Sequence, residues 1–284
     1  MIIWVLMNLI KLAKTGVHSS KRIFIILTLV FGLTGCSSLA EEFVGKAADL
    51  KMQRAVLTGS RFQHVVYTKT GYSSKTLHVY LDGDGNPWIA GRPSDDPTPG
   101  NPLVLNLMAL DVAPAVYVGR PCYHGVESIG ECSSRFWLQE RYSEEVVASL
   151  AAVIKQLLKQ GGYQKVSLFG HSGGGVLAVL LASRLPQTVS VVTVAANLDL
   201  DAWADYTKPN DLSGSLNPAF LAPLSPLVLQ YHYAGGKDEI VPPTLMANAA
   251  IHLGSKLIVV DDYDHLCCWE QIWLTVLDDL AKKL

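Results

Sequence analysis

Residues 165–174 have the sequence KVSLFGHSGG, in which a short apolar run leads into the pattern G-x-S-x-G around Ser172. The run Lys165–Phe169 predicts a buried strand, and Gly173–Leu185 predicts a helix that ends before Pro186. At a strand–turn–helix junction this pattern holds its serine in a strained turn, where side chains at the two glycine positions would collide with the strand and the helix. We therefore expect Ser172 to stand above a sheet edge, near the backbone N–H groups that begin the helix.

The segments around this junction alternate between strand and helix patterns. Strands are expected at Arg61–Thr70, Thr76–Leu81, Ala113–Gly119, Val189–Ala195, Leu227–Ala234 and Lys256–Val260, and helices at Ser143–Gln160, Pro242–Leu253 and Trp269–Lys283. The segments Asp82–Pro102 and Asn197–Pro226 are rich in turn-forming residues and are expected to be irregular. Apolar strands separated by helices predict the α/β class, with a mostly parallel sheet covered by helices on both faces. We expect one such domain over residues 61–284, preceded by a tether or outer helix over residues 36–60.

The composition of the 284-residue chain argues against two broad classes of protein. Its hydrophobic fraction is 49% and its formal net charge only −2, so the chain is too apolar and too weakly charged to be disordered. It has no basic surplus to neutralise phosphates, so no nucleic-acid partner is expected. The average conceals an asymmetry: residues 1–35 hold four basic side chains and no acidic one, whereas the rest carry 19 basic and 25 acidic.

The basic amino-terminal segment has the parts of a secretory signal. Lys21-Arg22 precede the apolar run Ile23–Leu33, which ends in small residues before Cys36. This run is too short to span a bilayer, which takes about 20 apolar residues. The exit resembles a bacterial lipobox, which implies that residues 1–35 are a signal peptide and that Cys36 is the lipidated first residue of the mature protein. A signal anchor that includes Met1–Ile10 is the alternative.

The lipobox resemblance implies a lipid-anchored protein of the bacterial cell envelope, attached to the membrane through Cys36. Ser37 follows it where an Asp would favour inner-membrane retention, so the outer membrane, facing the periplasm, is expected. Export also permits disulfides among the four other cysteines, which are Cys122, Cys132, Cys267 and Cys268. We favour Cys122–Cys132, which closes a short loop, and leave the pairing of the other two open. Neither pair has the CxxC spacing typical of zinc sites, so no metal is expected.

A serine hydroxyl needs a base, and the base needs an orienting carboxylate. The strand Leu227–Ala234 leads into a turn that contains Asp238, and the last predicted strand leads into a segment that ends at His265. With Ser172 before them, these residues occur in the chain order of a known serine-hydrolase arrangement.

On these motifs the chain from about Arg61 to Leu284 resembles the α/β-hydrolase superfamily, and it is similar to uncharacterised bacterial lipoproteins of that superfamily. The resemblance implies the α/β-hydrolase fold, with Ser172 as nucleophile, His265 as general base and then general acid, and Asp238 as the orienting carboxylate. Asp199 and Asp201 remain alternatives for the acid, because some members keep it after an earlier strand. His171 is interpreted as a residue of the pocket wall.

The mechanism also needs N–H donors for the developing oxyanion. The residue after the nucleophile, Gly173, is expected to supply one. The resemblance places the second in the loop after Thr76–Leu81, with Asp84 as the best match and Gly83 and Gly85 as alternatives. Asp82 stands where the family often has His, and two acidic side chains in this loop are expected to disfavour anionic substrates.

The sequence thus predicts an exported, lipid-anchored serine hydrolase that cleaves an ester or thioester through an acyl-enzyme, without a cofactor. A small-molecule or lipid ester is the expected substrate, with small or medium acyl groups favoured. The alternative is a non-catalytic envelope lipoprotein that uses the same fold as a binding scaffold. A redox role for Cys267 and Cys268 is a weaker hypothesis, because vicinal cysteines lack the CxxC spacing of redox motifs.

Overall fold

The computed structural model describes residues 38–126, 130–208 and 212–284. Residues 38–284 form one compact unit. The predicted signal peptide and Cys36 lie outside the described residues. No helix in the described ranges is both long enough and apolar enough to cross a membrane.

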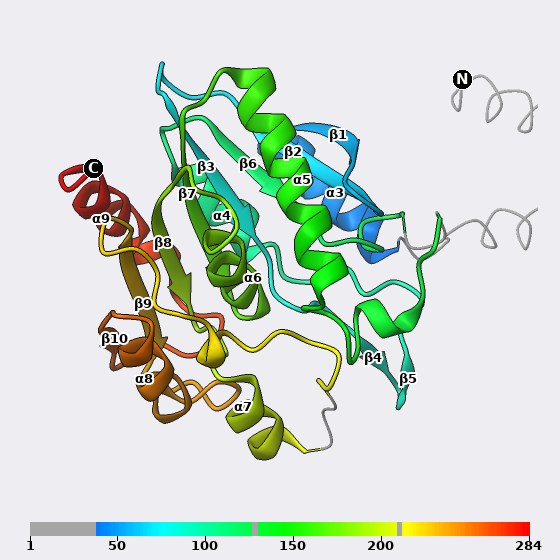
Figure 1. Ribbon diagram of the computed structural model, residues 1–284. Coiled ribbons are helices and arrows are strands. Elements are labelled where there is room, and N and C mark those ends of the chain that lie inside the picture. The colour runs from blue at the N-terminus through cyan, green and yellow to red at the C-terminus, as the bar shows by residue number, and fades with distance from the viewer. Residues whose placement is uncertain (1–37, 127–129, 209–211) are drawn as a thin grey trace, which may run out of the picture. The chain divides into compact units, whose positions relative to one another are not determined.

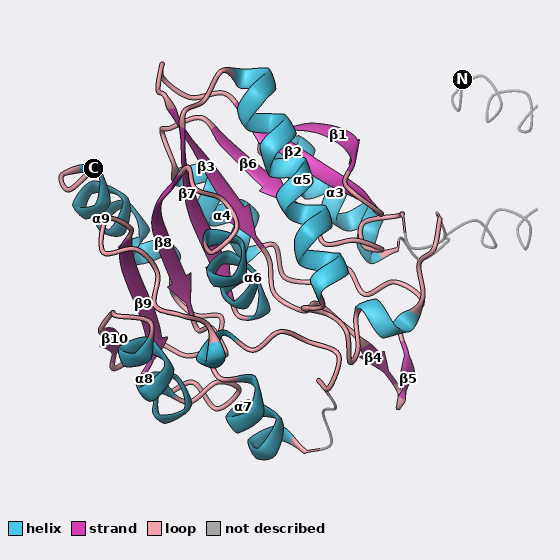
Figure 2. Cartoon of the chain, in the orientation of Figure 1, coloured by secondary structure: helices cyan, strands magenta, loops and turns pink. Residues whose placement is uncertain are grey.

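The unit is built on a mixed eight-stranded sheet with the order β1-β2-β6-β3-β7-β8-β9-β10. In chain order these strands are β1 Gln53–Thr58, β2 Gln63–Lys69, β3 Thr76–Leu81, β6 Ala115–Val118, β7 Lys165–His171, β8 Thr188–Val194, β9 Leu229–Gly235 and β10 Leu257–Val260. Strand β2 pairs antiparallel with both β1 and β6, whereas β3 and β6–β10 pair in parallel. A separate two-stranded hairpin, β4 Trp88–Ile89 and β5 Arg92–Pro93, projects from the loop after β3 (Figure 2).

Helices cover both faces of the sheet, so the predicted α/β class is confirmed. One face carries α5 Glu144–Gly161, α6 Gly173–Ala182 and α8 Pro243–His252, and Figure 1 shows α5 and α6 in front of the strands. The other face carries α3 Leu39–Asp49, α4 Leu103–Leu110 and α9 Glu270–Ala281. Each layer has its own buried apolar cluster, which explains why the central strands are apolar on both sides.

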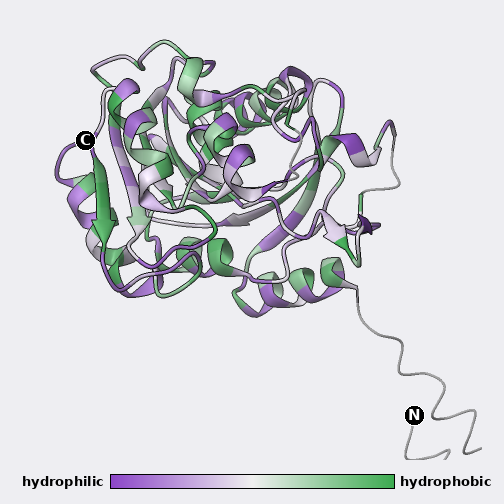
Figure 3. Ribbon diagram, turned by 90° about the horizontal axis from the view of Figure 1, so that it is seen from below, coloured by the Kyte–Doolittle hydropathy of each residue, from purple (hydrophilic) through white to green (hydrophobic). Residues whose placement is uncertain are grey.

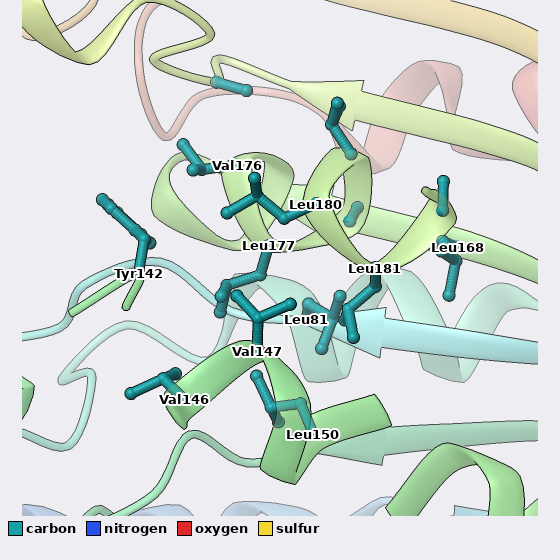
Figure 4. Close-up of a cluster of buried hydrophobic side chains, with 14 of the residues drawn as sticks. Leu81, Tyr142, Val146, Val147, Leu150, Leu168, Val176, Leu177, Leu180 and Leu181 are labelled. Carbon is teal, nitrogen blue, oxygen red and sulfur yellow. The ribbon is translucent and has the colours of Figure 1, made fainter. Parts of the chain in front are cut away.

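The packing of α5 and α6 fixes the helix that follows Ser172. The N-cap of α5 is Ser143, whose side chain accepts a hydrogen bond from Val146 N. Its C-cap is Gly162, which has the left-handed conformation. In Figure 4, Val147 of α5 points towards Leu177 of α6. Every residue of α6 is buried, so this helix is held on all sides.

The segment before residue 60 contains a helix and an edge strand. Helix α3 is present, with Phe43 and Ala47 buried, and Figure 3 shows hydrophobic and hydrophilic residues alternating along it where the grey trace ends. However, Gln53–Thr58 forms the edge strand β1 and pairs with β2 along six residues. Most of β1 is exposed, so its sequence has no alternation that would have distinguished a strand from a frayed helix.

Two more helices lie where no helix was expected. Helix α7, Leu200–Thr207, falls within the segment predicted to be irregular. Its N-cap Asp199 accepts hydrogen bonds from Asp201 N and Ala202 N, a start signal that the surrounding Pro and Asn residues obscured. Helix α4 is short and almost wholly apolar, so it has no amphipathic period to detect.

Candidate active site

The turn between β7 and α6 has the strained geometry expected for the serine. Ser172 has φ 51° and ψ −125°, and its N–H donates to Val194 O of the neighbouring strand at 2.9 Å. A Cβ on Gly170 would collide with the backbone of Gly174, and one on Gly174 would collide with the carbonyl of Leu81. The two glycines therefore allow strand, turn and helix to pack closely enough to raise the serine hydroxyl at the sheet edge.

A continuous chain of hydrogen bonds joins Ser172, His265 and Asp238. The Oγ of Ser172 lies 3.1 Å from Nε2 of His265, and Nδ1 of His265 lies 2.8 Å from Oδ2 of Asp238. The Asp238 side chain is fully buried, and its Oδ1 accepts from the N–H groups of Ile240 and Val241 at 2.9 and 2.8 Å. These backbone bonds fix the carboxylate, which in turn fixes the histidine ring.

This arrangement can transfer a proton from the serine. Because the Asp238 carboxylate only accepts hydrogen bonds, Nδ1 of His265 carries the proton and Nε2 is left with a lone pair directed at Ser172. The imidazole can then take the serine proton as the hydroxyl attacks, and the adjacent carboxylate stabilises the imidazolium that forms.

The rival acids lie elsewhere. Asp199 is occupied as the N-cap of α7, and the exposed Asp201 lines a different pocket. Glu239 is exposed, on the turn next to the buried Asp238. Of Asp199, Asp201 and Asp238, the structure brings Asp238 to His265.

His171 supports the loop that carries His265. Its ring Nε2 lies 2.8 Å from the backbone carbonyl of His265, and burial, reinforced by the His265 charge, lowers the pKa of His171 to about 4. The ring is therefore neutral near pH 7 and donates this hydrogen bond from Nε2–H. It also lines the pocket beside Ser172, as the sequence suggested.

The loop after β3 lies directly against the start of α6. A Cβ on Gly173 would collide with the carboxylate of Asp84, so the two predicted oxyanion donors are neighbours. Gly83 N–H donates to Asp82 Oδ1 at 2.8 Å and is occupied. A Cβ on Gly85 would collide with Pro97 O, so that glycine packs against a different loop. A Cβ on Gly83 would lie 3.2 Å from the Cβ of Ser172, so this loop packs against the serine, and Asp84 with Gly173 stays the predicted pair of oxyanion donors.

The two acids of this loop differ in charge. Oδ2 of Asp84 lies 2.7 Å from Arg141 Nη1, and Oδ1 lies 2.9 Å from Arg120 Nη1. Burial acts to raise the pKa of Asp84, but these two guanidinium groups and the hydroxyl of Tyr142 lower it overall. Asp82 has no such ion pair, and burial raises its pKa to about 7. Asp84 is therefore paired with two cations, whereas Asp82 has a raised pKa, so the two acids of this loop would act differently on an anionic substrate.

Ser172 and His265 line a pocket of about 500 Å³. Three large apolar side chains from separate segments also line it and are about half exposed: Trp88 at 48%, Ile240 at 50% and Leu266 at 42%. Arg141 contributes the cationic part of the lining. In the described ranges, no group of three or more His, Cys, Asp or Glu side chains is arranged to hold a metal ion.

Disulfides lie in two segments near the site. Cys122 and Cys132 are joined with an S–S distance of 2.02 Å and a Cα–Cα distance of 5.5 Å. Cys267 and Cys268 are joined to each other, two residues beyond His265. All four cysteines of the described ranges are therefore in disulfides.

Comparisons with known proteins bear on the fold of the chain. Residues 122–222 match the family model described as alpha/beta hydrolase fold. A 90-residue segment is 36% identical to triacylglycerol lipases of Pseudarthrobacter phenanthrenivorans and Burkholderia plantarii. That segment is 29% of this chain and 28% and 25% of the two lipases, so the match spans about a quarter of their length.

Solved structures extend the likeness over most of the chain. An esterase/lipase from an uncultured bacterium matches with a TM-score of 0.55 and 16% identity, over 88% of this chain and 93% of that one. An alpha-beta serine hydrolase homologue from Coxiella burnetii gives 0.53 and 15%, over 82% and 97%. The Pyrococcus horikoshii acylaminoacyl peptidase gives 0.56 and 12%, over 82% and 42%. The chain therefore has the α/β-hydrolase fold, and its expected resemblance to the α/β-hydrolase superfamily is confirmed.

Proposed function

We propose that this chain is a serine hydrolase that cleaves a carboxylic ester or thioester through an acyl-enzyme. The observation that carries the proposal is the chain of hydrogen bonds from Ser172 through His265 to the buried Asp238. Such a chain activates a hydroxyl that is otherwise a poor nucleophile. Its position on the strained turn beside an open pocket gives a substrate access to the serine.

The residues would act in the following order. Ser172 Oγ attacks the acyl carbon and its proton passes to Nε2 of His265. The N–H groups of Gly173 and Asp84 stabilise the oxyanion, each such donor typically contributing about 10²–10³ in rate. The intermediate then expels the alcohol or thiol, which takes the proton from His265. Water, deprotonated by His265, finally hydrolyses the acyl-serine and restores the hydroxyl.

The pocket favours an ester with an apolar acyl group. The half-exposed side chains of Trp88, Ile240 and Leu266 at the pocket offer apolar surface to a chain of carbon atoms. A volume of about 500 Å³ suits a small or medium acyl group. The partial match to triacylglycerol lipases supports the same substrate class.

We extend the proposal to a lipid anchor at Cys36 and a place in the bacterial cell envelope, at the outer membrane facing the periplasm. Cys36 is two residues before Ser38, the N-cap of α3. Leu39 lies against Gly100, which lines the same pocket as Ser172. An anchor at Cys36 would therefore hold the pocket near the membrane, where a lipid ester is available. Cys36→Ala should release the protein from the membrane fraction, whereas the neighbouring Ser37→Ala should leave it attached.

A fluorophosphonate probe tests the activity without knowledge of the substrate, because the probe needs an activated serine. The full chain should be labelled, and both Ser172→Ala and His265→Ala should lose the label. Ser183→Ala, at the end of α6, should retain it and serves as the matched control. If a folded wild-type chain is not labelled, the proposal fails and the non-catalytic scaffold becomes the better hypothesis.

A further inference from the structure

Four side chains of one segment surround Asp84. The Asp84 carboxylate accepts from Tyr142 OH at 2.6 Å and from Arg141 Nη1 at 2.7 Å, and Arg120 Nη1 lies 2.9 Å away. Tyr123 OH donates to the Asp84 backbone carbonyl at 2.9 Å. Both the side chain and the following peptide group of Asp84 are therefore held.

Burying the charged groups of this cluster away from water costs free energy. The side chains of Arg120 and Arg141 are each only 3% exposed. Two guanidinium groups face one carboxylate, so the cluster has an excess of one positive charge in a region where water screens it little. Contacts with the rings of Tyr123 and Tyr142 offset part of the lost hydration of the Arg120 guanidinium. The ring centroids lie 5.8 and 5.1 Å from Arg120 Cζ.

The cluster adjoins the point at which negative charge would develop during acyl transfer. Asp84 and Gly173 are so close that no side chain fits on Gly173, which directly follows Ser172, and Asp84 lines the same pocket as Ser172. A free Asp84 carboxylate at this place would repel an oxyanion. Pairing with two arginines reverses the sign of the local charge.

We propose that Arg120, Tyr123, Arg141 and Tyr142 are positioning residues for the oxyanion site, with two effects. They hold Asp84 so that its backbone N–H meets the substrate oxygen, and they convert an unfavourable carboxylate into part of a cationic cluster. This inference rests on the proposed serine-hydrolase function. A preorganised donor is effective because it needs no rearrangement during the reaction.

The segment that carries these residues is itself anchored. Arg120 follows strand β6, and Cys122, between Arg120 and Tyr123, is tied to Cys132. Arg141 Nε also donates to Leu138 O at 2.6 Å, which leaves its other nitrogens to face Asp84 and the pocket. The cluster is thus fixed independently of a substrate.

Tyr142→Phe tests the inference with a minimal change, because it removes one hydroxyl and keeps the ring. With p-nitrophenyl butyrate, kcat should fall about tenfold while KM stays within about twofold, since loss of a whole oxyanion donor costs about 10²–10³. Arg141→Met should cost up to about a hundredfold, and Arg141→Lys should recover part of it. Tyr67→Phe is the control, because this buried tyrosine belongs to the cluster on the other face of the sheet.

A second readout separates positioning from general structural damage. Sulfur is a weak hydrogen-bond acceptor, so the enzyme should strongly prefer an ester to the thionoester that has sulfur in place of its carbonyl oxygen. Loosening Asp84 should reduce this preference in Tyr142→Phe by about the same factor as kcat. A merely structural role would lower both rates equally and leave the ratio unchanged.

The outcomes distinguish the two proposals. If the wild type neither reacts with a fluorophosphonate nor hydrolyses the ester, the proposed function fails. If it does both, and Tyr142→Phe keeps the wild-type ester preference, whether or not its kcat falls, the positioning role is refuted while the function stands.

Discussion

Asp82 is a buried carboxyl group without a charged partner in contact. It follows β3 and is 4% exposed, and its Oδ1 accepts from Gly83 N. Its Oδ2 lies 3.4 Å from the hydroxyl of Tyr117, a long contact. Burial outweighs these two interactions and the charge of Arg120, and it raises the pKa of Asp82 from 3.8 to about 7. We predict that Asp82→Asn stabilises the fold at neutral and alkaline pH.

The direction of this pH effect on stability follows from proton binding to Asp82. Because the pKa of Asp82 is higher in the folded state, the folded state binds the proton more tightly and is favoured at low pH. That stability is lost as the pH rises from about 4 to about 7, and the full loss persists above pH 7. A rise of about three units corresponds to about 4 kcal/mol, which is the upper bound for the gain in Asp82→Asn at pH 8. Asn can still accept the bond from Gly83, so little should be lost below pH 4.

Urea unfolding of Asp82→Asn and of the wild type at several pH values between 4 and 9 would measure the difference in their free energies of unfolding. The matched control is Asp111→Asn, at a buried aspartate whose pKa is lowered because hydrogen bonds from His78 and Tyr80 outweigh burial. That variant should lose stability at neutral pH, and the loss should shrink in acid. If Asp82→Asn is destabilised equally at pH 5 and pH 8, the reasoning from the raised pKa is wrong.

Three further predictions concern the site and its frame. His265→Asn should lower ester turnover by about 10⁴ without lowering the melting temperature by more than a few degrees, because it removes the base but little packing; an active variant would exclude His265 as the base. Gly173→Ala should abolish turnover, because its Cβ would collide with Asp84. The control Gly45→Ala lies in α3 with open space around it, and its free energy of unfolding, measured by chemical denaturation, should rise by about 1 kcal/mol. Trp88→Ser combined with Leu266→Ser should reduce kcat/KM for octanoyl esters about tenfold or more and spare acetyl esters, measured with the two p-nitrophenyl esters; equal losses on both would argue against an acyl-binding rim.

The residues of the hydrogen-bonded chain could be predicted because each carries a local signal. Ser172 lies within a pattern that requires glycine at fixed positions, and Asp238 and His265 each follow an apolar strand. Parallel strands place their carboxyl ends at one sheet edge, so residues far apart in sequence meet there. The general architecture followed from the same alternation of strands and helices.

The cluster around Asp84 gave no comparable signal. Asp84 and Arg141 are 57 residues apart, and their contact depends on how the long segment after β6 folds back over the sheet. A charged residue in an irregular segment is usually solvated, so sequence alone favours that interpretation. One weak indication was present: Arg120 comes directly after an apolar strand, at the end where parallel sheets place their sites.

Asp82 and Asp84 show how distant residues decide the chemistry of a local motif. The two carboxyl groups are two positions apart on one loop, yet one has a raised pKa and the other a lowered pKa. The difference is that Arg141 and Arg120 form ion pairs with Asp84, whereas Asp82 forms none with the described residues. The charge beside Ser172 is therefore set by the segment after β6 rather than by the loop itself. A chain with the same serine turn and the same loop acids, but without Arg120 and Arg141, would present an unpaired Asp84 carboxylate to the oxyanion, so the turn alone does not define the site.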